Sequence, residues 1–441
     1  MIRFIGILLA MFTIGVMQLI LAAAMPFIVK DIGGESLYSW VFSAYMLASL
    51  VTIPIFSKLA DIYGKSKFFI FGLVLFGLGT LYGAFAPNMT HLVIARVIQG
   101  LSAGILTPIA LSLISEMFPQ EKRGKMIGVF GFVQLLSNLI SAPVGGFITR
   151  QLGWHWIFML TLILVVISVA CAAIGEKSAN NNKGVKLSDI DFAGGIIFGV
   201  FCVSIVALSK VISYKGRIDV NGIILLAITV CAFIAVVVLE KKHENPILKL
   251  EFFKTNIIRR SIFSSVIAGA IMYGLITILP ICGTVFEKQG YRVNESQILF
   301  LYMIGITIGI LFSSRYIKKL NSLWISKISW VVITACSILM LYSISVGSLI
   351  MFNIFNALMG FSTGCVMSTF LINSQNAVND EDRTVLSGIV QLGRYLGASI
   401  GVTILIGIIP DINSIAGISQ FWGAFLLLVG LTGVGLLNEF V

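Results

Sequence analysis

The chain has 441 residues, of which 58% are hydrophobic and 11% are charged, and its mean hydropathy is +1.02. These values exclude a soluble globular domain and indicate a membrane protein. The formal net charge of +11 does not indicate nucleic-acid binding, because most of the basic residues lie in short segments between apolar runs, as loop residues of membrane proteins do.

Fourteen apolar runs are long enough to cross a bilayer, which takes about 20 residues of helix. The sequence therefore predicts an all-α polytopic membrane protein. Because the number of spans is even, both termini are expected on the same side. The predicted spans lie near residues 4–28, 38–57, 68–86, 92–114, 126–149, 156–175, 190–210, 219–239, 260–285, 296–314, 323–345, 347–371, 384–408 and 416–438.

The distribution of Lys and Arg predicts the orientation. Of these 30 residues, 21 lie in the segments on the side of the termini and seven on the opposite side. Since cytoplasmic loops carry the excess of basic residues, both termini are predicted to be cytoplasmic. The remaining two residues, Arg96 and Arg394, lie inside spans.

A charged hairpin, Ser57–Lys67, joins the second and third spans with the sequence SKLADIYGKSK. Gly64 stands where a tight turn needs a positive φ, and Asp61 and Lys65 flank it. Two interpretations are open. The hairpin is either a solvated turn that obeys the charge bias, or a gate in which Asp61 meets the end of a helix from elsewhere in the chain.

Part of the sequence is repeated. The stretch Arg96–Gly104 on the fourth span is echoed by Asn356–Gly364 on the twelfth, and the hairpin has a weaker copy at Ser314–Asn321. In that copy Asn321 replaces the glycine, and Asn is the next most tolerant residue for a left-handed conformation. We therefore predict two six-helix units with two helices between them, an arrangement typical of secondary transporters. The predicted boundaries are residues 1–175, 176–256 and 257–441.

Polar residues inside the spans are candidates for a central cavity. A buried arginine costs about 2.5–3.5 kcal/mol on insertion scales, so Arg96 and Arg394 are expected to face a cavity or a partner. Arg96 also lies close enough to a span end to snorkel, and a structural hydrogen bond is the alternative for Arg394. The neutral polar residues are more often glue between helices than ligand contacts. The predicted cavity residues are Met17, Gln18, Tyr45, Gln134, Asn138, Tyr273, Asn353, Asn356, Gln391 and Arg394.

Enzymatic and cofactor-binding patterns are absent from the sequence. It has no phosphate-binding Gly-rich loop followed by Lys and Ser or Thr, so an ATP-driven pump is not indicated. The three histidines are far apart, and the six cysteines fall within apolar runs without metal-ligand spacing. We expect no catalytic residues, no metal and no cofactor.

The hairpin and the Arg96–Gly104 stretch, in this order, resemble motifs A and B of the major facilitator superfamily. The likeness is to its fourteen-span drug:proton antiporter branch and extends over essentially the whole chain. Motif A usually reads G-x-L-A-D-R-x-G-R-K, with Ser57 here in place of the first glycine. The resemblance implies a gating role for Asp61, Gly64 and Lys65, and a role for Arg96 in proton coupling.

Two differences from the branch concern coupling. Its antiporter motif on the fifth span, G-P-x-x-G-G, is represented by Pro143, Gly145 and Gly146, with the proline one place later. The branch commonly has an aspartate on the first span, at the position that Met17 occupies here. The proton-binding group is therefore sought among carboxylates at the ends of the spans, and the candidates are Asp31, Glu35 and Glu287. Asp61 in the hairpin and His155 are further titratable groups to be considered.

The resemblance implies a bacterial inner-membrane transporter that exports amphiphilic drugs or other toxic organic compounds in exchange for protons. Its partners would be the small-molecule substrate, protons and the lipid bilayer, without nucleic acid, and we expect a monomer. Two arginines and no carboxylate deep in a span favour neutral, zwitterionic or anionic substrates over dications. The alternatives are a uniporter or an exporter of a lipid-like compound or metabolite without proton coupling, and a non-transporting membrane sensor or scaffold.

Overall fold

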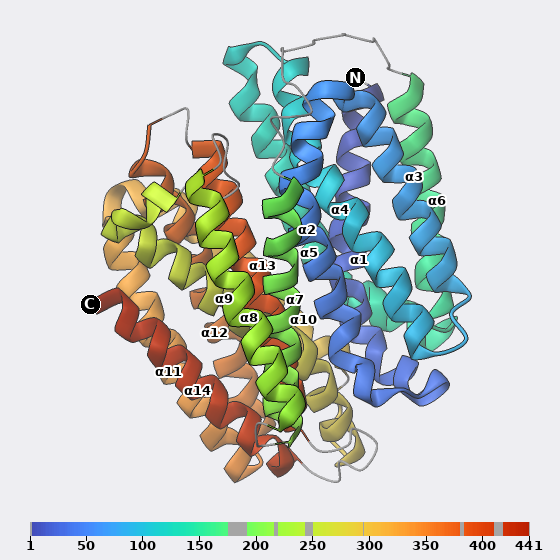
Figure 1. Ribbon diagram of the computed structural model, residues 1–441. Coiled ribbons are helices and arrows are strands. Elements are labelled where there is room, and N and C mark those ends of the chain that lie inside the picture. Colours follow the sequence, from blue (N-terminus) through green and yellow to red (C-terminus); the bar gives the residue numbers. More distant parts are fainter. Residues whose placement is uncertain are drawn as a thin grey trace. The chain divides into compact units, whose positions relative to one another are not determined.

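The computed structural model describes residues 2–174, 192–215, 219–242, 250–293, 295–379, 383–409 and 418–440. Within these ranges it consists of helices joined by short turns and loops, without strands (Figure 1). Fourteen of the helices are long and apolar enough to cross a membrane, as predicted. By contacts between Cα atoms the chain divides into two compact units, Met1–Val203 with Ala227–Ile247, and Ser204–Leu226 with Leu248–Val441.

The first unit contains six complete long helices and one short 3-10 helix. They are α1 (Ile2–Ile32), η1 (Glu35–Leu37), α2 (Tyr38–Tyr63), α3 (Lys65–Ala84), α4 (Met89–Met117), α5 (Gln120–Gln151) and α6 (His155–Ile174). Within the unit, α4 packs against α2 and α3, and α1 packs against α5 and α6.

The second unit repeats this packing. Its helices are η3 (Leu250–Lys254), α9 (Asn256–Lys288), α10 (Glu295–Leu320), α11 (Ser322–Val346), α12 (Leu349–Asn376), α13 (Arg383–Ile408), η5 (Ile418–Phe421) and α14 (Trp422–Phe440). Here α12 packs against α10 and α11, and α9 packs against α13 and α14. Each pair matches a pair of the first unit, eight helices earlier, so the structure carries the repeat that the sequence predicts.

The remaining two helices, α7 (Phe192–Lys215) and α8 (Val220–Lys242), each contribute a stretch to both units. In sequence they lie between the two sets of six, in keeping with the predicted order of six, two and six. The domain boundaries predicted from the sequence stay a prediction, and part of the first boundary region falls at residues 175–191, outside the described ranges.

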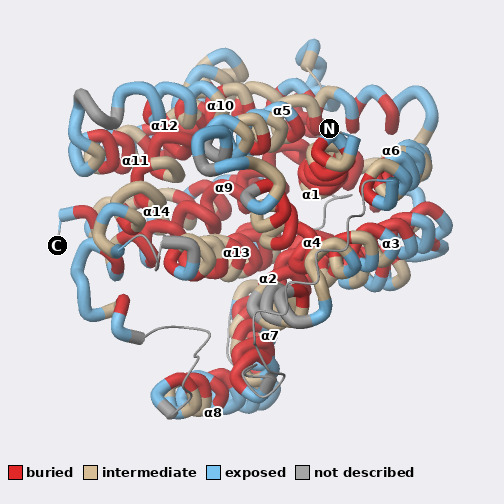
Figure 2. Tube along the Cα trace, turned by 90° about the horizontal axis from the view of Figure 1, so that it is seen from above, coloured by how far each residue is buried: buried red, intermediate tan, exposed pale blue. Residues whose placement is uncertain are grey.

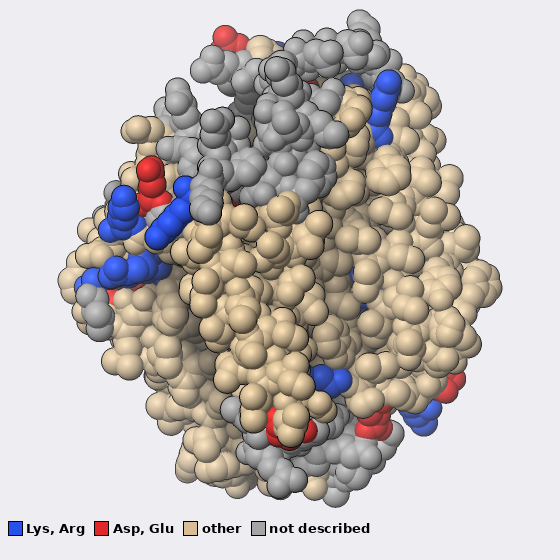
Figure 3. Space-filling view, viewed as in Figure 1, with Lys and Arg blue, Asp and Glu red and all other residues tan. Residues whose placement is uncertain are grey.

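Several helices extend beyond the predicted spans at both ends, as α5 does at Gln120–Gln151 against 126–149, whereas others, such as α3 (Lys65–Ala84 against 68–86), end slightly earlier. Backbone hydrogen bonds continue past the apolar run into the polar residues at each end. Burial follows the helix faces: Figure 2 shows buried faces turned towards neighbouring helices and exposed faces turned outwards. Many exposed side chains are large and apolar, and charged side chains are few on the face that Figure 3 draws. Such outer faces are suited to lipid.

Candidate functional site

Arg96, on α4, is a buried charge within the first unit, with 1% of its surface exposed. Its Nε donates a hydrogen bond to the carbonyl oxygen of Val41 at 3.0 Å, and its Nη1 donates to Oε1 of Gln99 at 2.8 Å. The guanidinium carbon lies 4.2 Å from the ring centroid of Tyr45, a cation–π contact. The side chain therefore turns into the helix bundle and does not snorkel to a membrane surface.

Met17 stands where the resemblance places an aspartate, and it lies beside Arg96. Its carbonyl oxygen is 3.5 Å from Nη1 of Arg96, and its side chain is fully buried, with Sδ 3.7 Å from Oγ1 of Thr161. Gln99 in turn donates from Nε2 to Oγ1 of Thr80 at 3.0 Å. The contacts of Arg96 thus link α1, α2, α3, α4 and α6 through neutral groups.

The charge of Arg96 is surrounded by neutral groups. Among the residues that the structure describes, no carboxylate is found in an ion pair with its guanidinium. Carbonyl and amide oxygens and an aromatic face compensate for the burial of the charge instead. The positive charge of this site is therefore not neutralised by an acid within the described part of the unit.

Two glycines of α4 allow this helix to approach α2 closely beside the Arg96 site. A Cβ at Gly100 would lie 2.3 Å from the carbonyl oxygen of Tyr45, and one at Gly104 would lie 2.6 Å from that of Ser49. The hydroxyl of Ser49 also donates to the carbonyl of Gly100 at 2.9 Å. Since Arg96 precedes Gly100 by one turn on the same helix face, this close approach of α4 to α2 places its guanidinium over Tyr45.

We call this close contact of two helices at a pair of glycines a glycine seam. The second unit has an equivalent glycine seam between α12 and α10. A Cβ at Gly360 would lie 2.3 Å from the carbonyl oxygen of Tyr302, and one at Gly364 would lie 2.2 Å from that of Ile306. The glycines thus occupy equivalent places in both units, and each seam includes a tyrosine.

Asn356 takes the place of Arg96 in this second seam. Its Nδ2 donates to the carbonyl oxygen of Ile298 at 2.8 Å, as Nε of Arg96 does to that of Val41. Its Oδ1 is buried without a hydrogen-bond partner in the described part of the chain, and so is Oδ1 of Asn353. The second unit therefore keeps the backbone contact of the site and loses its charge.

The hairpin predicted as a gate is a tight turn between α2 and α3. Gly64 has a φ of 104°, which confirms the predicted positive value. Nζ of Lys65 forms an ion pair with Oε1 of Glu116, at the end of α4. The backbone of Asp61 lies in the last turn of α2, but its side chain, like that of Lys318 in the second unit, falls outside the described part of the structure.

The copy of the hairpin between α10 and α11 has the same turn. Asn321 has a φ of 58° and is the one non-glycine residue with a positive φ in the described ranges. Its Oδ1 accepts a hydrogen bond from the backbone N–H of Leu323 at 3.1 Å, which caps α11. Ser322 donates to Oδ1 of Asn373 on α12, and this neutral pair spans 51 residues, as the Lys65 to Glu116 pair does.

The three predicted coupling carboxylates lie at helix ends. Asp31 is exposed near the end of α1, and its Oδ2 accepts a hydrogen bond from Nε1 of Trp154 at 2.8 Å. Glu35 is half-buried at the start of η1, and Glu287 is exposed at the end of α9. The described contacts of Arg96 and Asp31 involve different residues, so the structure shows no shared contact that connects these two coupling candidates.

The predicted antiporter motif lies on α5, where Pro143 is inside the helix. A Cβ at Gly145 would lie 2.7 Å from the carbonyl oxygen of Ile20, so α5 approaches α1 closely at this glycine. Gly146 is buried as well. Gly145 therefore allows α5 to pack closely against α1, as small residues commonly do between membrane helices.

The predicted cavity residues come from both units, and a shared cavity stays a prediction. In the described structure some are buried by neighbouring helices, namely Met17, Tyr45, Tyr273 and Asn356. The others are half-exposed, namely Gln18, Gln134, Asn138, Asn353, Gln391 and Arg394. The guanidinium carbon of Arg394 lies 5.6 Å from the ring centroid of the neighbouring Tyr395, and its buried Nε has no hydrogen-bond partner in the described residues.

Three carboxylates are buried although they lie at helix ends, and the sequence pattern does not predict this burial. Glu240, Glu295 and Glu439 are 4%, 0% and 8% exposed. Oε1 of Glu439, in the last turn of α14, accepts hydrogen bonds from the hydroxyls of Ser326 at 2.8 Å and Ser264 at 3.3 Å. These serines lie on α11 and α9, so the contact ties three helices of the second unit together.

No cluster of three or more His, Cys, Asp or Glu side chains that could hold a metal ion is found in the ranges that the structure describes. The six cysteines are free.

Comparison with known proteins gives consistent results. The profile of the Major Facilitator Superfamily matches residues 7–402. Multidrug resistance protein 3 of Bacillus subtilis is 30% identical over 407 residues, which cover 90% of this chain and 77% of that protein. Multidrug transporter protein MdtP of the same organism is 30% identical over 414 residues, covering 91% and 73%. Efflux pump FUS6 of Gibberella moniliformis is 30% identical over 197 residues, covering 44% and 35%.

Proposed function

Because this chain belongs to the major facilitator superfamily, and is therefore a transporter and not an enzyme, we propose that it exports amphiphilic organic compounds, including drugs, in exchange for protons. The observation that carries the proposal is the similarity, over about nine-tenths of the chain, to two proteins named as multidrug transporters or resistance proteins. The repeated six-helix packing supports a mechanism in which two units alternate in opening a central site.

We place the chain in a bacterial cell membrane as a monomer with both termini in the cytoplasm. The support for the position of the termini is the excess of Lys and Arg in the segments on their side. Cysteines introduced by Lys67→Cys and Lys288→Cys in a cysteine-free background would test it. In intact cells a membrane-impermeant maleimide should label only the second, and labelling of the first alone would reverse the orientation.

The charge of the preferred substrate is proposed from the Arg96 site. Its guanidinium is buried against neutral acceptors, without an ion pair to a carboxylate in the described part of the chain. A dication near a positive charge that no carboxylate neutralises would be strongly disfavoured in a low-dielectric site, whereas a neutral, zwitterionic or anionic amphiphile would not. We therefore propose the latter classes as substrates.

Transport into proteoliposomes with an imposed pH gradient tests function and charge preference together. The panel should contain one amphiphile of each charge class, including a bis-quaternary dye, with gradient collapse by a protonophore as the control. Uptake that needs the gradient and favours the neutral, zwitterionic or anionic members is expected. High-affinity uptake of the dication would contradict the charge preference, and uptake that survives gradient collapse would contradict proton coupling.

A further inference from the structure

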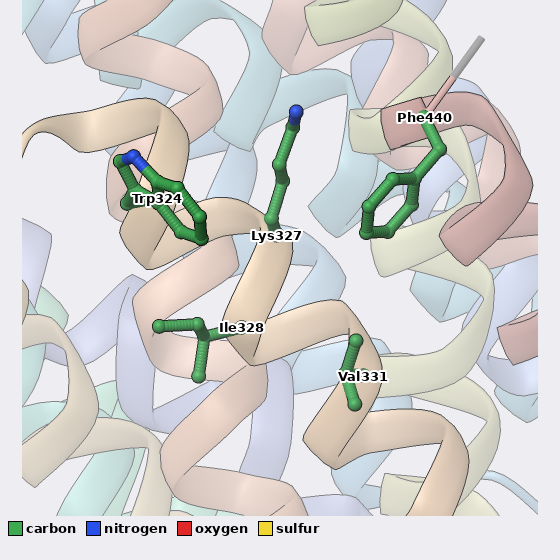
Figure 4. Close-up of a pocket in the computed structure, with 5 residues that line it drawn as sticks. All are labelled: Trp324, Lys327, Ile328, Val331 and Phe440. Atoms are coloured by element: carbon green, nitrogen blue, oxygen red, sulfur yellow. The ribbon is translucent and has the colours of Figure 1, made fainter.

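A small pocket lies on the outside of the second unit, where α11 begins and α14 ends. It has a volume of about 220 Å³ and is lined by Trp324, Lys327, Ile328, Val331 and Phe440. The four α11 residues follow the spacing of one helix face, and Phe440 closes the pocket from the last turn of α14 (Figure 4). We propose that this pocket binds one anionic phospholipid of the leaflet that faces the chain ends.

The charge at the mouth of the pocket fits an anionic headgroup. Figure 4 shows the Lys327 side chain standing between the rings of Trp324 and Phe440, and its Nζ lies 5.2 Å from the Phe440 ring centroid. No ion pair is found for Lys327 within the described ranges. The nearby carboxylate of Glu439 is buried and accepts hydrogen bonds from Ser326 and Ser264. Thus Lys327 presents its positive charge outwards.

The apolar part of the pocket fits an acyl chain. Trp324 is 63% exposed, Ile328 57%, Val331 47% and Phe440 61%, although all are large apolar side chains. Trp324 lies in the first turn of α11, and tryptophan is enriched at the ends of membrane spans, where they meet the interface; Val331 lies about 6 Å further along the axis than Lys327. A headgroup phosphate at Lys327 therefore leaves the acyl chain running along Ile328 and Val331 into the hydrocarbon.

Basic residues beside membrane helices attract anionic lipids, by roughly fivefold in affinity for each Lys or Arg near the surface. Several other basic residues lie at the same end of the second unit, and Asn438, two residues before Phe440, donates to the carbonyl oxygen of Arg260 at 3.2 Å. These charges would raise the local concentration of anionic lipid. Lys327 differs from them in standing over an apolar pocket, which makes a defined site and not only a charged surface.

Trp324 serves as the reporter in a test on the full-length protein in nanodiscs. Brominated phosphatidylglycerol or brominated phosphatidylcholine is titrated in, and the fluorescence of Trp324 is taken as the difference between the protein and its Trp324→Phe variant. Half-quenching is expected at a several-fold lower mole fraction of the glycerol lipid. Equal quenching by the two lipids would overturn the proposal.

Matched variants separate the site from general surface charge. Lys327→Gln should remove the preference for phosphatidylglycerol, whereas Arg315→Gln, which removes an exposed charge near the end of α10 and outside the pocket, should reduce the preference much less. Val331→Trp should fill the pocket and weaken quenching, whereas Ile338→Trp, on an exposed face of α11 outside the pocket, should not. An unchanged preference in Lys327→Gln overturns the site. The proposal is also overturned if quenching of Trp324 fluorescence depends on the protein concentration and not on the lipid headgroup, because the pocket would then be occupied by a second copy of the chain.

Discussion

Gly64 has a backbone conformation, φ 104° and ψ 118°, that a residue with a Cβ rarely adopts. The space around it is open, because a Cβ there would meet no atom within 4 Å. Any cost of a side chain at this turn is therefore a backbone cost, in the range of about 1–3 kcal/mol. Asn321 meets the same demand in the second unit and stabilises its turn with a cap.

The Gly64→Ala variant should accordingly be less stable, by about 1–3 kcal/mol, in thermal unfolding of the detergent-solubilised protein. Gly128→Ala is the matched control, since this glycine also faces open space but lies in the regular part of α5. There the change should be neutral or stabilising by up to about 1 kcal/mol, because alanine favours a helix. Equal effects at the two positions would show that the positive φ does not determine the stability of the turn.

The Arg96→Ala variant should lose export by at least about tenfold and lose about 1–3 kcal/mol of stability, because Val41 and Gln99 lose a buried hydrogen-bond donor. Arg150→Ala is the control: that side chain is exposed, with its guanidinium carbon 5.6 Å from the Phe27 ring centroid. Accumulation of a fluorescent substrate and thermal unfolding measure the two effects. Wild-type export by Arg96→Ala would remove this residue from the transport mechanism.

The Asp31→Asn variant should lose the dependence of export on the pH gradient, while Glu287→Gln should keep it. Asn retains an oxygen that can accept the hydrogen bond from Trp154, so the change removes the titrating group and leaves the contact. The response of export rate to imposed pH gradients in proteoliposomes provides the measurement. A full response in Asp31→Asn would exclude Asp31 as the proton-binding group.

Between elements, the glycine seams determine how closely α4 approaches α2 and α12 approaches α10. At both Gly100 and Gly360 an added Cβ would lie 2.3 Å from a backbone carbonyl oxygen, and neither backbone can move away without separating the helices. Gly100→Ala and Gly360→Ala should each destabilise the protein by about 1–3 kcal/mol, as overpacking does. Gly430→Ala, where a Cβ on α14 meets open space, should be nearly neutral. Thermal unfolding distinguishes them, and a neutral Gly360→Ala would mean that the α12 seam relaxes.

At the scale of the whole molecule, the gate should be asymmetric. The first hairpin has Asp61 where the second has Lys318, and an ion pair of Lys65 with Glu116 where the second has Ser322 with Asn373. Asp61→Asn should abolish export without preventing membrane insertion, and Lys318→Gln should have a mild effect. Export is read in cells and insertion by the amount of protein in the membrane fraction. Export by the Asp61→Asn variant would contradict the asymmetry. So would a loss of export in the Lys318→Gln variant when that variant is present in the membrane in normal amounts.

The sequence was sufficient for features that depend on local chemistry or on long apolar runs. The helices, the positive φ at Gly64 and its replacement by Asn321 belong to this class. The sequence was not sufficient to predict the direction in which individual side chains point. The choice between snorkelling and burial at Arg96 depends on how closely Gly100 lets α4 approach α2. The burial of Glu439 could not be predicted either, because it lies beyond the predicted span and its serine partners come from two helices distant in the chain.

The two seams have a consequence for experiments on this protein: each unit is an internal reference for the other. A substitution at Gly100 has its counterpart at Gly360, and Arg96 has its counterpart at Asn356, in the same backbone surroundings. A loss that appears at both members of a pair reports on assembly of the helices. A loss confined to one member reports on what that half alone does during a transport cycle. The duplication therefore allows folding and transport defects to be separated within a single polypeptide.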